Sequence, residues 1–133
     1  MDFHTPRDAF FTPAADFDAV FGRFVEANIR NKAACVLVAV VDERVVGYCQ
    51  AMLDRHPPAI ADRDYGQILD LAVTAHHRGT GVGEQMFAAL GDWFRKKGVR
   101  RIEVRHSTLN EIAERFWSKM GFTPDLQMLF TEL

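Results

Sequence analysis

The apolar residues of this chain recur with two different periods, which separate predicted helices from predicted strands. Over residues 15–30 they recur every three or four positions and form one face of a helix that we expect to pack on the core: Phe17, Val20, Phe21, Phe24, Val25 and Ile29. Residues 35–41 and 44–52 are mostly apolar runs rich in valine, which predict two strands. Asp42 and Glu43 separate these runs, so we expect a β-hairpin with a two-residue turn.

The hairpin register predicts the state of the two cysteines. If the loop is two residues long, residue 36 pairs with residue 49, which sets Cys35 and Cys49 on opposite faces of the sheet. Side chains on opposite faces cannot form a disulfide, so we expect both cysteines to be reduced thiols in the core.

The rest of the chain alternates between loop, strand and helix patterns. Residues 54–65 combine two prolines with five charged residues and predict the longest surface loop. The elements that follow are predicted as strands over 67–74, 101–106 and 126–133 and as amphipathic helices over 82–97 and 110–120. This order of elements indicates an α+β fold in which helices cover a mixed sheet.

The composition bounds the class of protein. A chain of 133 residues, 48% hydrophobic and 26% charged, suits one globular domain, which we expect to span residues 1–133. Its formal net charge of -2 gives no reason to expect a nucleic acid or an anionic membrane as a partner. No apolar run approaches the roughly 20 residues that span a bilayer, and the first four residues do not resemble a secretory signal. We therefore expect a cytoplasmic protein.

A glycine-rich segment, Arg-Gly-Thr-Gly-Val-Gly at 78–83, lies between a predicted strand and a predicted helix. At such a junction unpaired backbone N–H groups and the positive end of the helix dipole meet, and glycines let the backbone approach a phosphate closely. The spacing does not fit the dinucleotide fingerprint, because Glu84 and Met86 stand where its third glycine is needed. It does not fit a Walker loop either, because Glu84-Gln85 replace the required lysine and hydroxyl residue. The segment therefore predicts an anion site of another type.

Two segments resemble signatures of the GCN5-related N-acetyltransferase (GNAT) family. Residues 68–73, Ile-Leu-Asp-Leu-Ala-Val, together with the glycine-rich segment look like its coenzyme A motif. Residues 110–122, Asn-Glu-Ile-Ala-Glu-Arg-Phe-Trp-Ser-Lys-Met-Gly-Phe, are similar to its second signature, and Val-Val-Gly-Tyr at 45–48 resembles the hairpin before them. The resemblance covers residues 33–133 and implies a mostly antiparallel sheet flanked by helices, with a splayed cofactor-binding strand.

The resemblance also implies a reaction and a cofactor site. Acetyl-CoA would be the cosubstrate, and a primary amine of a small molecule or peptide would attack it directly in a ternary complex. Backbone groups of residues 71–73 would pair with the pantetheine arm, and those of residues 79–83 would cradle the pyrophosphate. The cofactor contacts implied are Leu71, Ala72, Val73, Arg78, Gly79, Thr80, Gly81, Val82, Gly83, Asn110 and Phe116.

Trp117 is the main departure from the family pattern, and it bears on catalysis. Many members carry a tyrosine there that protonates the leaving thiolate, whereas an indole N–H is a donor without usable acidity. The alternative function is therefore an acyl-CoA-binding sensor or a degenerate domain with little turnover.

Two carboxylates are candidates for the general base that deprotonates the acceptor ammonium. Glu103 stands where some relatives carry a catalytic glutamate, and Asp70 lies on the predicted cofactor strand. Each also has a structural interpretation: Glu103 as a surface charge paired with Arg101 or Arg105, and Asp70 as a carboxylate that binds a turn or loop.

Adjacent histidines precede the glycine-rich segment, at His76 and His77. Adjacent side chains on an extended chain point in opposite directions, and no cysteine or third histidine stands nearby. We therefore expect no metal site.

The N-terminal residues predict the oligomeric state. Residues 1–14 contain two prolines and no alternating apolar run, so we expect the family's first edge strand to be absent. The hairpin 35–52 would then expose an open sheet edge, which proteins usually cover or pair. We expect a homodimer that buries this edge or the predicted strand 126–133.

Overall fold

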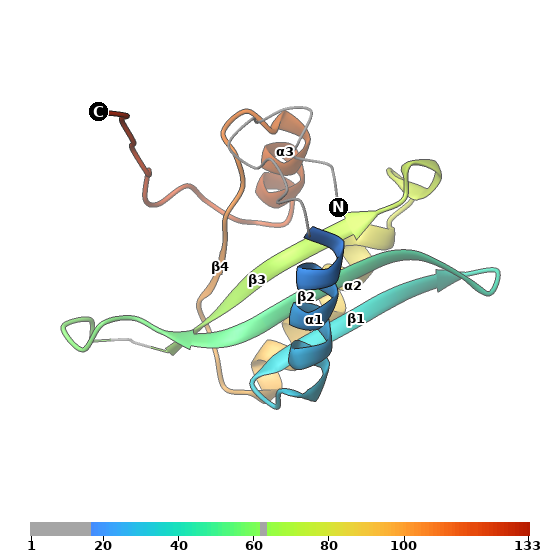
Figure 1. Ribbon diagram of the computed structural model, residues 1–133, viewed down its shortest axis with the longest axis horizontal. Helices are drawn as coiled ribbons and strands as arrows, with labels where there is room; N and C mark the ends of the chain where they lie inside the picture. Colours follow the sequence, from blue (N-terminus) through green and yellow to red (C-terminus); the bar gives the residue numbers. More distant parts are fainter. Residues whose placement is uncertain (1–16, 62–63) are drawn as a thin grey trace.

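The computed structural model describes residues 17–61 and 64–133, which form one four-stranded sheet with helices on both faces (Figure 1). The elements in chain order are α1 (Phe17–Arg30), β1 (Ala34–Val41), β2 (Arg44–Arg55), β3 (Asp64–Val73), the short 3₁₀ helix η2 (Ala75–His77), α2 (Val82–Lys96), β4 (Ile102–Val104) and α3 (Glu111–Lys119). The sheet order is β1-β2-β3-β4, antiparallel except for the parallel pair of β3 and β4. The predicted α+β fold with a mixed, mostly antiparallel sheet is confirmed.

The core lies between the sheet and α2, which crosses the face opposite to α1 (Figure 1). Leu90 and Phe94 of α2 are completely buried against strand residues such as Cys49. The Phe94 ring lies directly over Gly66 of β3, where any Cβ atom would overlap it. This close approach needs a glycine, and it sets the distance between α2 and the sheet.

Helix α1 differs from the predicted core helix. Phe24 and Ile29 belong to its expected apolar face, yet they are 44% and 63% exposed. Among the α1 side chains that the structure describes, those of residues 22–30, Asn28 is buried, and its Nδ2 donates to Gln50 Oε1 at 3.0 Å. The apolar period predicted the helix correctly, but it did not indicate this polar contact between α1 and β2.

The two-residue hairpin turn is confirmed. Asp42 and Glu43 both adopt positive φ, at 50° and 64°, as a type I′ turn requires. Glycine and asparagine reach this conformation at little cost, whereas Glu43 has a Cβ that opposes it. The turn therefore holds the backbone of Glu43 in a strained conformation.

The register beyond the turn corrects the predicted faces of the two cysteines, although both are free core thiols as predicted. A bulge between Ala39 and Val40 shifts the pairing by one residue, so Cys35 faces Ala51, and Leu37 faces Cys49. One inserted residue moves the side chains to the other face. Both cysteines therefore pack on the same, core side of the sheet, and both are free thiols.

Three predicted segments have other bounds in the structure. The connection predicted over 54–65 is shorter, because β2 and β3 extend to Arg55 and Asp64, which form an ion pair at 2.9 Å. The strand predicted over 101–106 has three residues. The strand predicted over 126–133 does not form: these residues pair with none of the described strands, and Leu126 is 94% exposed.

The expected absence of a first edge strand concerns residues 1–14, which lie outside the described residues. Within residues 17–61 and 64–133, no helix has both the length and the apolar character to cross a membrane.

Replacing Glu43 by glycine should stabilise the fold. The positive φ of 64° costs glutamate about 1 kcal/mol, and glycine adopts it freely, although glycine also gains entropy in the unfolded chain. We expect a net gain of about 0.5–1 kcal/mol in the free energy of unfolding, measured by equilibrium urea denaturation. The matched control is Glu26→Gly on the exposed side of α1, which should destabilise by about 1 kcal/mol. Equal effects of the two substitutions would contradict the strained turn.

Candidate functional site

The segment between β3 and α2, residues 78–83, is called the glycine cradle below. Gly79 and Gly81 both have positive φ, at 77° and 92°, which explains why glycine stands at these positions. A Cβ placed on either glycine would meet none of the described residues within 4 Å apart from its two neighbours in the chain. The cradle is therefore open on the side where these side chains would point.

The cradle ends at the N-terminus of α2. Gly81 is the N-cap and no side chain caps the helix; the first helical bond runs from Gln85 N to Gly81 O at 3.0 Å. The N–H groups of residues 82–84 consequently have no acceptor within the helix. Together with the positive end of the helix dipole they form a site suited to an anion such as a phosphate.

Two side chains hold the cradle against the end of β3. Arg78 Nε donates to the carbonyl oxygen of Val73 at 3.1 Å, and Thr80 Oγ1 donates to the carbonyl oxygen of His77. The exposed Arg78 guanidinium therefore lies beside both the strand end and the cradle, where it adds positive charge.

Strands β3 and β4 separate before the cradle is reached. They pair only over Gly66–Ile68 and Ile102–Val104, and β3 continues to Val73 without β4 beside it. Figure 1 shows β4 turning away toward α3 as β3 runs on. Among the strands that the structure describes, none pairs with this edge of β3 between the split and the cradle.

A bulge determines which backbone groups of β3 face the open edge. Gly66 N donates to Arg101 O at 2.8 Å, toward β4, whereas Thr74 N donates to Val46 O at 2.8 Å, toward β2. In a strand without a bulge, the N–H groups of two even-numbered residues would point to the same neighbouring strand. The register shift opposite Gln50 changes this alternation. The peptide groups of Leu71 and Val73 therefore point away from β2, into the open edge.

A polar network on the α1 face holds Asp70, one of the two candidate bases. Gln50 is completely buried; it accepts from Asn28 and donates through Nε2 to Asp70 Oδ2 at 2.6 Å. The Tyr48 hydroxyl also bonds to Asp70. Burial, and after it the nearby Asp70 charge, raises the pKa of the Tyr48 phenol well above its ordinary value. Asp70 is thus a fixed carboxylate just beyond the split.

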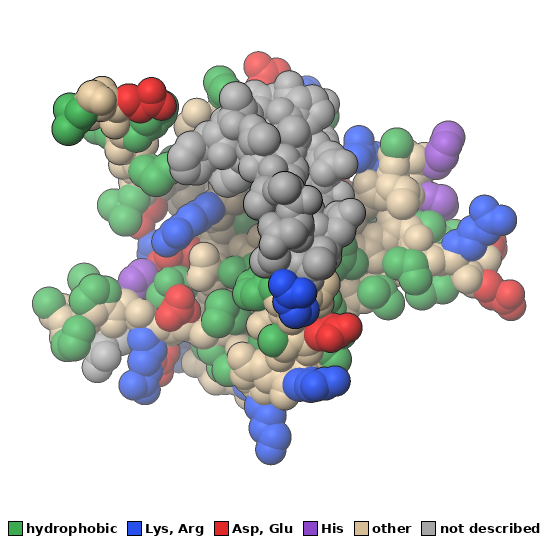
Figure 2. All heavy atoms as spheres, viewed as in Figure 1, with side chains coloured by type: hydrophobic (Ala, Val, Ile, Leu, Met, Phe, Trp, Pro, Cys, Tyr) green, Lys and Arg blue, Asp and Glu red, His purple; other side chains and the backbone are tan. Residues whose placement is uncertain are grey.

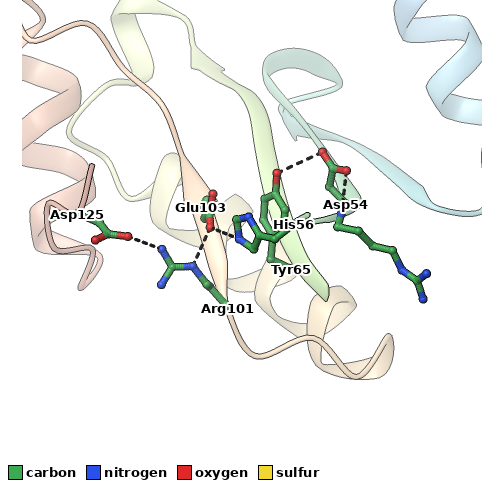
Figure 3. Close-up of polar contacts among 7 residues, drawn as sticks. Asp54, His56, Tyr65, Arg101, Glu103 and Asp125 are labelled. Atoms are coloured by element: carbon green, nitrogen blue, oxygen red, sulfur yellow. Dashed lines mark hydrogen bonds and ion pairs between the residues drawn. The ribbon is translucent and has the colours of Figure 1, made fainter. Parts of the chain in front are cut away.

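Glu103, the other candidate base, lies on β4 just before the split and has two partners (Figure 3). Its Oε2 accepts from Arg101 Nε at 2.7 Å and bonds to His56 Nε2 at 2.8 Å. Arg101 also donates to Asp125 Oδ2 at 2.7 Å. The structural interpretation that pairs Glu103 with Arg101 is confirmed, and His56 is an additional partner.

Sequence reasoning missed His56, which it assigned to a surface loop. The imidazole stacks on the Tyr65 ring with centroids 4.1 Å apart, and Tyr65 donates to Asp54 at 3.2 Å (Figure 3). The contact with Glu103 spans 47 residues of sequence. No local pattern could have indicated it, since only the folding of the β2–β3 hairpin beside β4 brings the two groups together.

The second signature joins α3 to the cradle helix by packing. Asn110 is completely buried, and its Oδ1 caps α3 by accepting from Ala113 N at 3.1 Å. A Cβ on Gly83 would lie 3.0 Å from the Phe116 ring, so that ring packs directly on α2. Trp117 is 8% exposed and meets three phenylalanine rings edge-on: Phe87, Phe116 and Phe122. Ligand contacts of Asn110, Phe116 and Trp117 stay predictions.

The two candidate bases lie on the neighbouring strands β3 and β4, and the cradle follows β3. Asp70 and Glu103 flank the split, and the cradle follows the far end of β3 (Figure 1). Among the described residues, no three His, Cys, Asp or Glu side chains gather as a metal site would require. The arrangement can hold an anionic group at the cradle and a proton acceptor near the split.

Comparisons with known proteins assign the fold to a family. The model of the acetyltransferase (GNAT) family matches residues 3–122. The tetramutant of the BH1408 protein from Bacillus halodurans superposes with a TM-score of 0.86 at 26% identity, over 98% of this chain and 85% of that one. Aminoglycoside N-acetyltransferase AAC(6')-Iy in complex with CoA superposes with a TM-score of 0.77 over 87% of this chain and 77% of that one; at 20% identity it shows the fold alone.

Curated relatives are longer than this chain. The putative ribosomal protein bS18-alanine N-acetyltransferase of Bacillus subtilis (strain 168) is 26% identical over 76% of this chain and 62% of its own length. Two further relatives are covered over 24% and 52% of their lengths. The chain thus spans less than two thirds of the curated relatives it matches. Because the family model covers most of its residues, this chain belongs to the acetyltransferase (GNAT) family.

Proposed function

We propose that the chain is an acetyl-CoA-dependent N-acetyltransferase that acts on a primary amine of a small molecule or peptide. The observation that carries the proposal is the continuity of the open β3 edge with the glycine cradle. Membership of the GNAT family supports it, as does the CoA bound to AAC(6')-Iy, a protein of the same fold.

The residues of the cradle and the strand fit the two polar parts of coenzyme A. The pyrophosphate would lie on the N–H groups at the start of α2, in the space left open at Gly79 and Gly81, with Arg78 beside it. The amides of the pantetheine arm would pair with the outward peptide groups of Leu71 and Val73, as a partner strand would. When bound, acetyl-CoA supplies an activated acetyl thioester with a thiolate leaving group.

Direct transfer to the amine fits the positions of the cysteines. Both lie on the core side of the sheet, and burial raises the pKa of Cys49 to about 12. A thiol in this state is a poor nucleophile, so no cysteine is available for a covalent acetyl intermediate. The amine would attack in a ternary complex, after a base near the split has removed its proton.

Trp117 favours a second candidate function, an acyl-CoA sensor with little turnover. Its ring is buried among three phenylalanine rings and brings no acidic hydroxyl to the site. Release of free thiol from acetyl-CoA in the presence of a peptide with N-terminal alanine, an aminoglycoside and a polyamine would distinguish the two. An enzyme releases thiol faster with one of these amines than without, and a sensor does not.

We also propose that the chain acts as a homodimer. Five apolar side chains that follow α3 are at least 80% exposed, and Figure 2 shows hydrophobic side chains along this C-terminal segment: Leu126, Met128, Leu129, Phe130 and Leu133. Among the described residues β1 pairs with β2 alone, so its outer edge has no strand beside it. A second copy would cover the apolar segment or this edge.

Acetyl-CoA should raise the melting temperature of the protein, because it binds the folded cradle only. At a concentration a hundred times its Kd the gain is about 2.7 kcal/mol. Gly81→Asp should abolish the shift, because its carboxylate would enter the phosphate path. Gly98→Asp is a matched control, since Gly98 has a similar φ of 76° and open space but lies at the other end of α2. Loss of the shift in both variants, or in neither, would contradict the proposed cradle.

Trp117→Tyr should restore acid catalysis if the ring position matches that of the family's tyrosine. The comparison is with Trp117→Phe, which removes the same indole from the aromatic cluster without adding a hydroxyl. We expect the tyrosine variant to turn over about 10- to 100-fold faster than the phenylalanine variant, at unchanged acetyl-CoA affinity. Equal rates of thiol release would show that protonation of the thiolate does not limit turnover.

The dimer predicts a particle of twice the 15.1 kDa chain mass in sedimentation equilibrium. Leu129→Asp with Phe130→Asp should lower the mass to that of one chain, because two charges would enter the apolar contact. Gln127→Asp places a charge on the same exposed segment without removing an apolar side chain, and it should leave the dimer intact. A wild-type mass of one chain at tens of micromolar would refute the dimer.

A further inference from the structure

We propose that Gln50 is a positioning residue for acetyl-CoA: its buried side chain fixes where β3 bulges and thereby orients the first outward peptide group of the open edge. This inference rests on the acetyl-CoA site proposed above. Gln50 lies on β2, is completely buried and stands outside the segments that resemble family signatures.

The bulge in β3 consists of one extra residue, Leu69. Gln50 pairs with Asp70, and the next β2 residue, Ala51, pairs with Ile68. Leu69 is therefore the residue of β3 that is skipped in the pairing with β2. A bulge of this kind exchanges the two faces of the strand beyond it.

The core requires a bulge in this part of β3 but does not by itself set its position. Ile68 is buried in the core, and Leu71 and Val73 pack against the same core. In a regular strand Ile68 and Leu71 would point to opposite faces, because they are an odd number of residues apart. One extra residue between them removes the conflict, and either Leu69 or Asp70 satisfies this condition.

The bond between Gln50 and Asp70 selects Leu69 as the extra residue. Gln50 Nε2 donates to Asp70 Oδ2 at 2.6 Å, and Gln50 Oε1 accepts from Asn28 Nδ2 at 3.0 Å. If Asp70 were the extra residue, Leu69 would stand opposite Gln50, and the buried amide would lose its carboxylate partner. A buried amide without a partner is costly, so the observed register is favoured.

The position of the bulge determines how the open edge begins. β4 pairs with β3 as far as Ile68, so Leu69 and Asp70 are the first residues beyond the split. Asp70 resumes the pairing with β2, and the peptide groups of Leu71 and Val73 face outward from there. A bulge one residue later would change the Leu71 peptide group, the outward group nearest the split. The thioester end of the pantetheine arm would pair here, far from the pyrophosphate at the cradle.

Two ligands separate this positioning role from a general loss of structure. 3′-Phosphoadenosine 5′-diphosphate carries the pyrophosphate of coenzyme A without the pantetheine arm, whereas acetyl-CoA has both. Gln50→Leu keeps the approximate size of the side chain and removes both bonds. It should raise the Kd of acetyl-CoA about 10-fold, the effect of a lost hydrogen bond. The Kd of the diphosphate, measured by the same isothermal titration calorimetry, should stay within about two-fold of wild type.

Gln67→Leu is the matched control. Gln67 lies on β3 before the bulge, and strand alternation with the buried Ile68 points it to the sheet face on which Gln50 bonds to Asn28. The side chain is half-buried. The same substitution at this position should change the Kd of neither ligand.

A reversed pair tests the bond itself. Gln50→Glu alone sets a second carboxylate against that of Asp70, and it should weaken acetyl-CoA binding by about 10-fold or more. Adding Asp70→Asn lets the new amide donate to the new carboxylate, while Asn28 keeps its acceptor. This double variant should regain the acetyl-CoA affinity to within about three-fold of wild type. In ¹H–¹⁵N NMR, acetyl-CoA should shift the Leu71 amide signal of the wild type and of the double variant more than that of Gln50→Leu.

Four results would overturn the inference. The first is a Gln50→Leu variant with the acetyl-CoA affinity of the wild type, and the second is an equal loss of affinity for both ligands. The third is a double variant that binds acetyl-CoA no better than Gln50→Glu; this comparison decides the matter if Gln50→Leu does not fold. The fourth is a wild type that binds neither ligand, which would refute the acetyl-CoA site itself, whereas the first three leave that site standing.

Discussion

The bulge in β3, placed where β4 ends, is the constraint on which the site depends. One extra residue opposite Gln50 changes which peptide groups face each side of the strand. Before the bulge β3 pairs with β2 and β4; after it the groups of Leu71 and Val73 face an edge that β4 has left. A polar edge next to water costs little free energy, but it offers a ligand backbone donors and acceptors.

The packing of helix α2 fixes the position of the cradle relative to β3. Phe94 lies on Gly66 at one end of β3, and Gly83 lies against Phe116 of α3 at the other, so the helix has little freedom to slide. Its N-terminus is thereby held at the end of the open edge. The glycines allow positive φ and leave open space, while the packing of large aromatic rings positions the helix. Neither alone would align the helix dipole with the strand.

The part of the candidate site near the split is assembled from polar contacts rather than from apolar packing. Asn28, Gln50 and Asp70 form a chain of bonds from α1 to β3, and His56, Glu103 and Arg101 form a second group beside β4. Buried polar groups are costly unless bonded, and no buried side-chain N or O atom among the described residues lacks a partner. Such networks hold carboxylate and imidazole groups in one orientation, which proton transfer requires.

The amino-acid sequence by itself determined the order of elements from residue 17 to residue 120, the two-residue turn at Asp42 and Glu43, and the glycine cradle. These features depend on local periodicity and on backbone conformations that particular residues permit, so a short window is enough to predict them. The exposed Phe24 and Ile29 mark the limit of that reasoning, because an apolar period identifies a helix but not what covers it.

Only the tertiary structure decided the register of the hairpin, the common face of Cys35 and Cys49, the split of β3 from β4 and the pairing of His56 with Glu103. Each depends on contacts between residues far apart in the chain: a one-residue bulge reverses every side chain beyond it, and a bond across 47 residues leaves no local pattern. The segment 126–133 shows that a local pattern can also predict a strand that does not form. Its composition suits a strand, but a strand exists only where another backbone lies alongside it, and no described element lies there.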